Sequence, residues 1–278
     1  MRLSCTMALA GVILAASAPA WAADYAAQVI NYSSGSTYPH PAPTDPVVDH
    51  PGQVDASVTN AAGALGGLTA DTGFGALTPF NGVFDPSQYV GIGQGGSLEL
   101  QFAQPVKTSG FTIGVHTGVG LIDMDYPNGS TVGGAIAYST PRVATVDVSK
   151  DGTNWVTLGS HAFDNPSNYY SSGITTPGYQ AVTSGLIAAD PSLPFTGSLS
   201  DLSGQTWSGM LSVFNGSTGG TWLDLSSAGL SQVDYIRFTV DTGNVMYVDS
   251  VVGLAVPEPA SLGVLGLGAA ALLARRRR

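Results

Sequence analysis

The aspartates in glycine-rich segments are the residues of this 278-residue sequence most suggestive of metal chemistry. Asp123 and Asp125 alternate with Met124 in the segment 118–134, and loop carboxylates with nearby carbonyls are the oxygen ligands that calcium prefers. The full EF-hand spacing is absent, since no Glu follows at the required distance. The pair therefore predicts either a solvated turn or a structural calcium site. We expect no cofactor other than this calcium ion. Asp249, on the last predicted strand, would be a buried ligand or a hydrogen-bond acceptor.

Aromatic residues in or beside predicted loops suggest a second kind of chemistry. They are Tyr126, Tyr169, Tyr170, Tyr179, Trp207 and Trp222. Aromatic faces stack on sugar rings, and the polar atoms of Tyr and Trp tolerate water. Two interpretations stay open: a glycan site carried by Trp207, Trp222, Tyr169 and Tyr170, or a satellite core under long loops.

Enzymatic chemistry finds little support in the residue types and their spacing. The four histidines, His40, His50, His116 and His161, form no pair with zinc-hydrolase spacing. No Gly-x-Ser-x-Gly motif presents a nucleophilic serine. A glycosidase needs two facing carboxyl groups, and Glu99, the one Glu of residues 23–256, is predicted to point outward from a strand. We predict a protein that is not an enzyme and has no catalytic residues.

Charge excludes a further class of partner. Residues 23–256 carry four basic side chains against eighteen acidic ones, a net charge of −14. Such a surface repels phosphate backbones, so we expect no nucleic-acid binding. The sole cysteine, Cys5, lies outside this region, so the region has no disulfide and must be stabilised by core burial.

The elements that would position these residues read as short strands separated by Gly, Asn and Asp turns. We predict strands at 26–31, 96–102, 110–115, 142–149, 155–158, 210–214, 233–240 and 245–254. Alternation places Leu98, Leu100 and Phe102 in the core. Turns at 151–152 and 242–244 predict two hairpins, and residues 38–51 and 165–209 read as long loops. The fold class is all-β, an antiparallel β-sandwich or jelly roll.

Four segments carry a resemblance to a known fold family. They are residues 89–102, 144–155, 233–238 and 248–251. The series resembles the galactose-binding-like (discoidin-type) jelly rolls of bacterial surface proteins. The resemblance implies that Asp151 and Gly152 turn a hairpin and that Trp155 packs against the core. The resemblance does not imply a ligand-binding site in this chain.

The amino-terminal residues 1–22 read as a secretory signal peptide. Arg2 precedes the apolar run 8–18, and the small residues Ala20 and Ala22 place cleavage before Ala23. The alternative, a membrane anchor, would need an apolar run of about 20 residues.

The carboxyl-terminal residues have three parts in a fixed order. Pro257, Glu258 and Pro259 precede an apolar stretch at 260–274, and the basic tail is Arg275, Arg276, Arg277 and Arg278. As a transmembrane helix the apolar stretch spans about 22 Å, shorter than a bilayer core of about 30 Å. Snorkelling arginines and local thinning close such a gap, and the stop-transfer arginines stay cytoplasmic.

This order of parts resembles the PEP-CTERM sorting signal, over residues 257–278. The resemblance implies recognition by an exosortase-type transpeptidase, cleavage near the Pro-Glu-Pro motif, and transient anchoring in the inner membrane. It also implies a location at the cell envelope, the cell surface or the extracellular matrix, with exopolysaccharide or biofilm as partner. We therefore predict a signal peptide (1–22), a β-sandwich ectodomain (23–256) and a sorting signal (257–278). The alternatives are a purely structural matrix component and a secreted polysaccharide hydrolase.

Overall fold

The structure, a computed structural model, describes residues 23–39, 52–83, 85–134 and 142–256. The predicted signal peptide with Ala20 and Ala22, most of the proline-rich segment, and the sorting tail 257–278 with its predicted transmembrane helix lie outside the described residues. The predicted domain boundaries therefore stay predictions.

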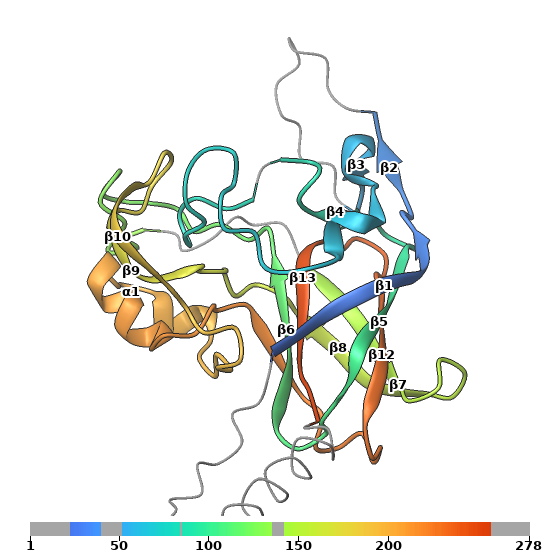
Figure 1. The fold of residues 1–278 in the computed structure, drawn as a ribbon. Coiled ribbons are helices and arrows are strands. Elements are labelled where there is room, and N and C mark those ends of the chain that lie inside the picture. The colour runs from blue at the N-terminus through green and yellow to red at the C-terminus, as the bar shows by residue number, and fades with distance from the viewer. Residues whose placement is uncertain (1–22, 40–51, 84, 135–141, 257–278) are drawn as a thin grey trace, which may run out of the picture.

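An antiparallel β-sandwich forms the body of the described chain (Figure 1). Nine of the described strands follow the order β11-β6-β13-β1-β5-β12-β7-β8, with β4 paired to β13. They are β1 (Ala23–Ser33), β4 (Val90–Ile92), β5 (Ser97–Val106), β6 (Phe111–Thr117), β7 (Val143–Ser149), β8 (Trp155–Ala162), β11 (Thr221–Asp224), β12 (Val233–Thr239) and β13 (Met246–Leu254). The predicted all-β sandwich is confirmed, whereas the discoidin-type resemblance stays a prediction.

Strand β1 joins the two layers of the sandwich. Its first residues, Ala23 to Tyr25, pair with β13, and the residues from Ala26 onward pair with β5. The first layer therefore contains β11, β6, β13 and β4, and the second contains β5, β12, β7 and β8. A strand shared in this way closes one side of the sandwich and leaves fewer exposed edges.

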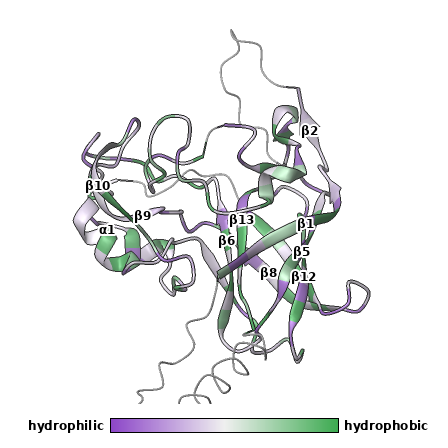
Figure 2. Cartoon of the chain, viewed as in Figure 1, coloured by the Kyte–Doolittle hydropathy of each residue, from purple (hydrophilic) through white to green (hydrophobic). Residues whose placement is uncertain are grey.

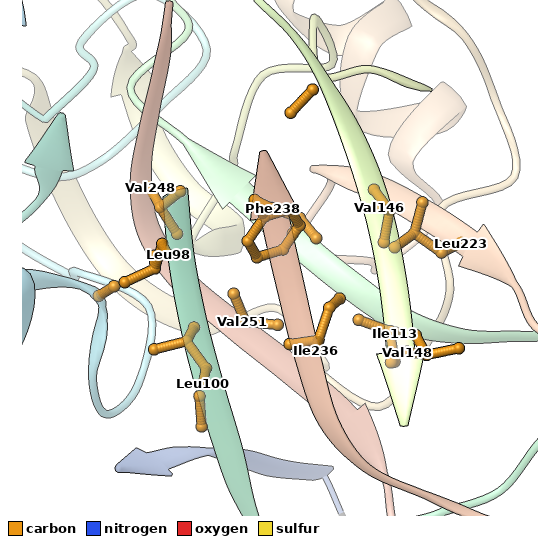
Figure 3. Packing of buried hydrophobic residues seen from close by; sticks show 14 of the residues in the cluster. Leu98, Leu100, Ile113, Val146, Val148, Leu223, Ile236, Phe238, Val248 and Val251 are labelled. Atoms are coloured by element: carbon orange, nitrogen blue, oxygen red, sulfur yellow. The ribbon is translucent and has the colours of Figure 1, made fainter. Parts of the chain in front are cut away.

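The main hydrophobic core lies between the two layers. Leu98 and Leu100 of β5 are fully buried there, as the alternation in the sequence predicted. Figure 3 shows them near Val248 and Val251 of β13, with Phe238 of β12 next and side chains of β7 and β6 further along the same core. Burial of these apolar side chains is the main stabilising contribution available to a domain without disulfides.

A third layer covers the outer face of β11, β6 and β13. It contains the hairpin of β9 (Tyr170–Thr176) and β10 (Val182–Ala188), the 3-10 helix η3 (Leu199–Leu202) and the helix α1 (Trp207–Phe214). These elements pack a second core cluster against Trp222, Val252 and Leu254. Figure 1 shows α1, β9 and β10 together on one side of the sandwich, and Figure 2 shows hydrophobic residues in α1.

Two predictions for this region are wrong. The predicted strand 210–214 lies in α1, because Trp207, Met210 and Phe214 have the spacing of one helical face and are all buried. The Thr206 side chain caps its amino end. The segment 165–209, predicted to be a loop, holds the β9–β10 hairpin and η3.

The two predicted hairpins have different outcomes. Strands β7 and β8 pair around the predicted turn, where the Asp151 carboxylate accepts hydrogen bonds from the backbone of Thr153 and Asn154. The prediction for 242–244 is wrong, because β12 pairs with β5 and β7 whereas β13 pairs with β1, β4 and β6. That turn carries the chain from one layer to the other.

The outer face of the second layer carries polar side chains. Arg237 forms an ion pair with Asp147 at 3.0 Å, and its guanidinium lies 4.2 Å from the centre of the Trp155 ring. The Trp155 ring is half-buried beneath Arg237 and is not among the residues of the main cluster or those packed against it, so the expectation that it packs against the core is wrong.

Short elements close one end of the sandwich. They are β2 (Thr37–Tyr38), β3 (Val54–Asp55) and the 3-10 helices η1 (Ala56–Val58) and η2 (Ala61–Ala64). Val54, Val58 and Val245 form a small core there.

Gly114 of β6 makes room for the ring of Trp222, its partner on the neighbouring strand β11. A Cβ atom at this position would lie 2.7 Å from the Trp222 ring. We expect Gly114→Ala to lower the free energy of unfolding by about 1–3 kcal/mol, because overpacking forces the ring or the strand to move. Urea unfolding followed by tryptophan fluorescence measures the change.

Gly118 offers a matched control just beyond the same strand. A Cβ atom there would have its nearest neighbours at 3.8 Å, an ordinary contact distance. Gly118→Ala should change the stability by less than about 0.5 kcal/mol. Equal losses from the two substitutions would contradict the packing role of Gly114.

Candidate functional site

The sorting motif predicted from the sequence begins directly after Val256, the last residue that the structure describes. The Val256 amide donates to the Pro105 carbonyl at 2.7 Å, and the Lys107 amide donates to the Leu254 carbonyl at 3.0 Å. Ala255 is buried and bridges to Val106. The backbone is therefore held by the fold up to the residue before Pro257, with no flexible spacer ahead of the motif.

The amino end of the described chain lies beside this exit. Ala23 of β1 pairs with Leu254 of β13, and Asp24 pairs with Gly253. The Asp24 carboxylate also accepts a hydrogen bond from the Gln104 amide at 2.7 Å. Both ends of the described body thus leave from the same edge of the sandwich.

Three loops gather near the opposite end of β13. Strand β6 ends at Thr117, which pairs with Val248, and the segment 118–134 follows. Leu254 lies six positions after Val248, about 20 Å along a strand. The Leu121 amide donates to Pro79 at 2.7 Å, which ties this segment to the loop 66–83.

The third of these loops, residues 176–181, is bound to the other two. The Gln180 amide donates to the Phe74 carbonyl at 2.9 Å, and the Gly178 amide donates to the Pro127 carbonyl at 3.3 Å. The buried Asn81 side chain holds the 72–76 turn, because its amide nitrogen donates to the Phe74 and Ala76 carbonyls. The three loops therefore form one cross-linked surface.

Aromatic side chains project from this surface. Tyr126 is 61% exposed and Tyr179 is 44% exposed, and both were among the aromatic residues predicted to lie in loops. Phe74, 43% exposed, has its ring centre 5.2 Å from that of Tyr179. The sequence reasoning missed Phe74, although its place between Gly73 and Gly75 marks it as a turn residue.

Trp207 and Trp222 lie in the core, away from this surface. Both rings are buried in the cluster beneath the third layer. The Trp207 ring N–H donates to the Ile174 carbonyl and that of Trp222 to the Gly219 carbonyl, each at 3.0 Å. The glycan-stacking prediction for these two residues is corrected to a packing role, because neither ring is accessible.

Tyr169 and Tyr170 lie at the rim of the core. Their ring centres are 4.8 Å apart, and both side chains are half-buried. Tyr169 packs against the Leu68, Leu77 and Val83 cluster, and Tyr170 packs against the cluster of the third layer. This packing matches the alternative interpretation, a satellite core under loops.

Asp123 organises its own loop. Its carboxylate accepts hydrogen bonds from the backbone amides of Asp125 (3.0 Å), Gly129 (3.1 Å) and Ser130 (3.0 Å). Asp125 is exposed. Within the described residues, no three His, Cys, Asp or Glu side chains gather in a group that could hold a metal ion. The structure therefore supports the turn interpretation and does not bring Asp123, Asp125 and Asp249 into a calcium site.

Asp249 is a buried carboxyl group on β13. The β13–β6 register shifts at this residue, so β13 has one residue more than its partner there. The Asp249 carboxylate accepts hydrogen bonds from the Thr69 hydroxyl at 2.8 Å and the Thr69 amide at 3.3 Å. Desolvation raises the pKa of Asp249 to about 7, although the Thr69 bonds act in the opposite direction. Asp249 thus acts as the predicted hydrogen-bond acceptor and fastens the loop 66–83 to the sheet.

This carboxyl group should make the stability depend on pH. Because its folded-state pKa is raised above the unfolded value of 3.8, the folded state holds the proton more tightly, and stability falls as the pH rises from about 4 to about 7. Asp249→Asn, which is always neutral, should remove a loss on the order of a few kcal/mol. Urea midpoints at about pH 5 and about pH 8 measure it.

The control for this prediction is Asp241→Asn, which removes the same charge from an exposed position. It should leave the difference between the two midpoints as in the unchanged protein. An Asp249→Asn protein with the same pH dependence as the unchanged protein would show that the carboxyl group does not hold a proton in the folded state.

His116 belongs to a buried polar network. Its Nδ1 lies 3.2 Å from the Ser250 hydroxyl and its Nε2 lies 3.0 Å from the Thr218 hydroxyl. Burial lowers the pKa of His116 to about 4, so the ring is neutral near pH 7. Since His116 and Ser250 are fully buried, this serine–histidine pair joins β6 to β13 and the third layer without access to a substrate.

Comparison with known proteins finds a sorting motif at the carboxyl end of the chain. Residues 255–278 match the family described as the PEP-CTERM protein-sorting motif. No curated protein matches the chain. None of the helices in the described part of the chain is long and apolar enough to cross a membrane. The match confirms the predicted sorting signal and implies export, recognition by exosortase and transient membrane anchoring.

Proposed function

We propose that this exported, exosortase-sorted chain is a non-enzymatic protein of the cell surface or extracellular matrix whose sandwich contacts exopolysaccharide. The observation that carries the proposal is the sorting motif at residues 255–278, which directs the chain to the envelope. The described sandwich, whose backbone is hydrogen-bonded up to Val256, would be the part delivered outside.

The surface of the body supports contact with a polymer. Tyr126 and Tyr179 project from cross-linked loops, and such aromatic faces suit sugar rings. The net charge of −14 over residues 23–256 disfavours nucleic acid as the partner.

The test has two parts. Intact-mass analysis of the protein from its own cells should give an amino terminus at Ala23 and a carboxyl terminus near Val256 to Pro259. The purified 23–256 domain should then cosediment with exopolysaccharide from the same cells. Absence of cosedimentation would favour a purely structural component, and release of soluble sugar products would favour a hydrolase.

A further inference from the structure

The three exposed rings of Phe74, Tyr126 and Tyr179 form one continuous surface, here called the aromatic patch. Phe74 and Tyr179 are in ring contact at 5.2 Å. The Tyr126 ring lies over Gly178, since a Cβ atom at Gly178 would be 3.0 Å from it. Three loops distant in sequence therefore bring two rings into contact and place the third over the residue that precedes Tyr179.

The patch is held in place before any ligand arrives. Besides the hydrogen bonds between the loops, the Thr78 hydroxyl donates to the Pro177 carbonyl, and the Gly129 backbone packs close to Pro177. Loops ordered in this way lose little conformational freedom on binding, and such preorganisation favours affinity. Exposed aromatic side chains on an ordered support are typical of a binding surface.

The area of the patch argues against a protein partner. A covered aromatic side chain buries about 150–250 Å², so three rings near half exposure offer on the order of 300 Å². A stable protein interface needs about 800 Å² on each partner. The patch therefore suits a ligand of one to a few rings, or a short stretch of a polymer.

Charge narrows the ligand class. The segments 66–83, 118–134 and 176–181 contain Asp71, Asp123 and Asp125 and no Lys, Arg or His. Asp71 and Asp125 are exposed on the same loops as the Phe74 and Tyr126 rings. Carboxylates accept hydrogen bonds from hydroxyl groups and repel anions, so the surroundings of the patch favour a ligand that is neutral and rich in hydroxyls.

We infer that the aromatic patch is a docking surface for a neutral polysaccharide, with the rings stacked on sugar faces and the aspartates accepting hydroxyl hydrogen bonds. This inference rests on the proposed contact with exopolysaccharide and assigns that contact to particular residues. It replaces Trp207 and Trp222, which the fold buries.

The test compares the unchanged 23–256 domain with the variant F74A/Y126A/Y179A. Binding is measured by cosedimentation with exopolysaccharide from the same cells and on a glycan array with neutral and uronic-acid-containing polymers. We expect the variant to bind at least about tenfold more weakly, and the unchanged domain to prefer neutral polymers. The variant Y126F/Y179F, which keeps both rings, should bind like the unchanged domain.

The matched control removes three exposed apolar side chains elsewhere, in I30A/F111A/I187A. It should bind like the unchanged domain, and thermal unfolding of all variants confirms that they fold. If the unchanged domain binds its exopolysaccharide and F74A/Y126A/Y179A binds equally, the patch is not the site and the proposed function stands. No binding by the unchanged domain would overturn both. A preference for uronic-acid polymers, or a change in sedimentation that shows self-association through the patch, would overturn the ligand class.

Discussion

Alanine at Pro257, Glu258 and Pro259 together is expected to abolish processing at the carboxyl terminus. The chain should still be exported and lose residues 1–22, because the signal peptide is untouched. It should keep Arg278 and accumulate in the membrane fraction, since the match over 255–278 implies that exosortase recognises this motif. Intact mass and fractionation of the cells measure both effects.

The control removes three prolines from another part of the chain, at Pro41, Pro43 and Pro46. That variant should be processed like the unchanged protein. If the Pro257/Glu258/Pro259 variant instead gives the same carboxyl terminus as the unchanged protein, the Pro-Glu-Pro motif does not direct the cleavage.

Phe238→Ala is expected to have the largest effect on folding. Phe238 is fully buried on β12, and its ring meets that of Phe163 edge to face with ring centres 5.7 Å apart. Removal of a buried Phe side chain costs about 3–5 kcal/mol, and a whole domain is commonly stable by about 5–15 kcal/mol. The body has no disulfide to offset the loss, because the sole cysteine of the chain is Cys5. Urea unfolding of the 23–256 domain at neutral pH measures the change.

The adjacent Thr239 gives the matched control. It follows Phe238 on the same strand, and its side chain is half-buried rather than enclosed in the core. Thr239→Ala should lower the free energy of unfolding by about 1 kcal/mol or less. Equal losses from the two substitutions would contradict the central place of Phe238 in the core.

The strands of the second layer were predictable from sequence because one of their faces meets the core and the other meets water. In β5, Leu98 and Leu100 are buried while Glu99 between them is half-exposed, and this gives the alternation that predicts a strand. The β7–β8 hairpin was predictable for a local reason, since Asp151 and Gly152 supply the turn themselves.

The third layer could not be predicted in the same way. Strand β9 contains Ser, Gly and Thr with one buried apolar side chain, Ile174, so it lacks an alternating pattern. The apolar run 210–214 is too short to distinguish a strand from a helix by periodicity. The predicted 242–244 hairpin failed because a turn residue does not determine which layer the next strand joins.

The residues of the candidate site also differ in how far the sequence could predict them. The sorting signal is a linear motif, so its residues could be read in order from Pro257 to Arg278. Whether an aromatic residue is buried depends on segments far away in sequence, and for this reason the sequence left open whether Trp207 and Trp222 are accessible or buried, as the structure has them. The contact of Phe74 with Tyr179 could not be predicted, because it joins two loops that are far apart in the sequence.

The pairing of Ala23 with Leu254 determines how the protein would be displayed. An attachment at Val256 would also keep Ala23, the amino terminus expected after signal-peptide cleavage, close to the point of attachment. The aromatic patch, near the far end of β13, would then face the surrounding medium at about 20 Å from the point of attachment. In this arrangement both chain ends would lie at the attached end of the domain, and the aromatic patch at the opposite end would be accessible to secreted polymers.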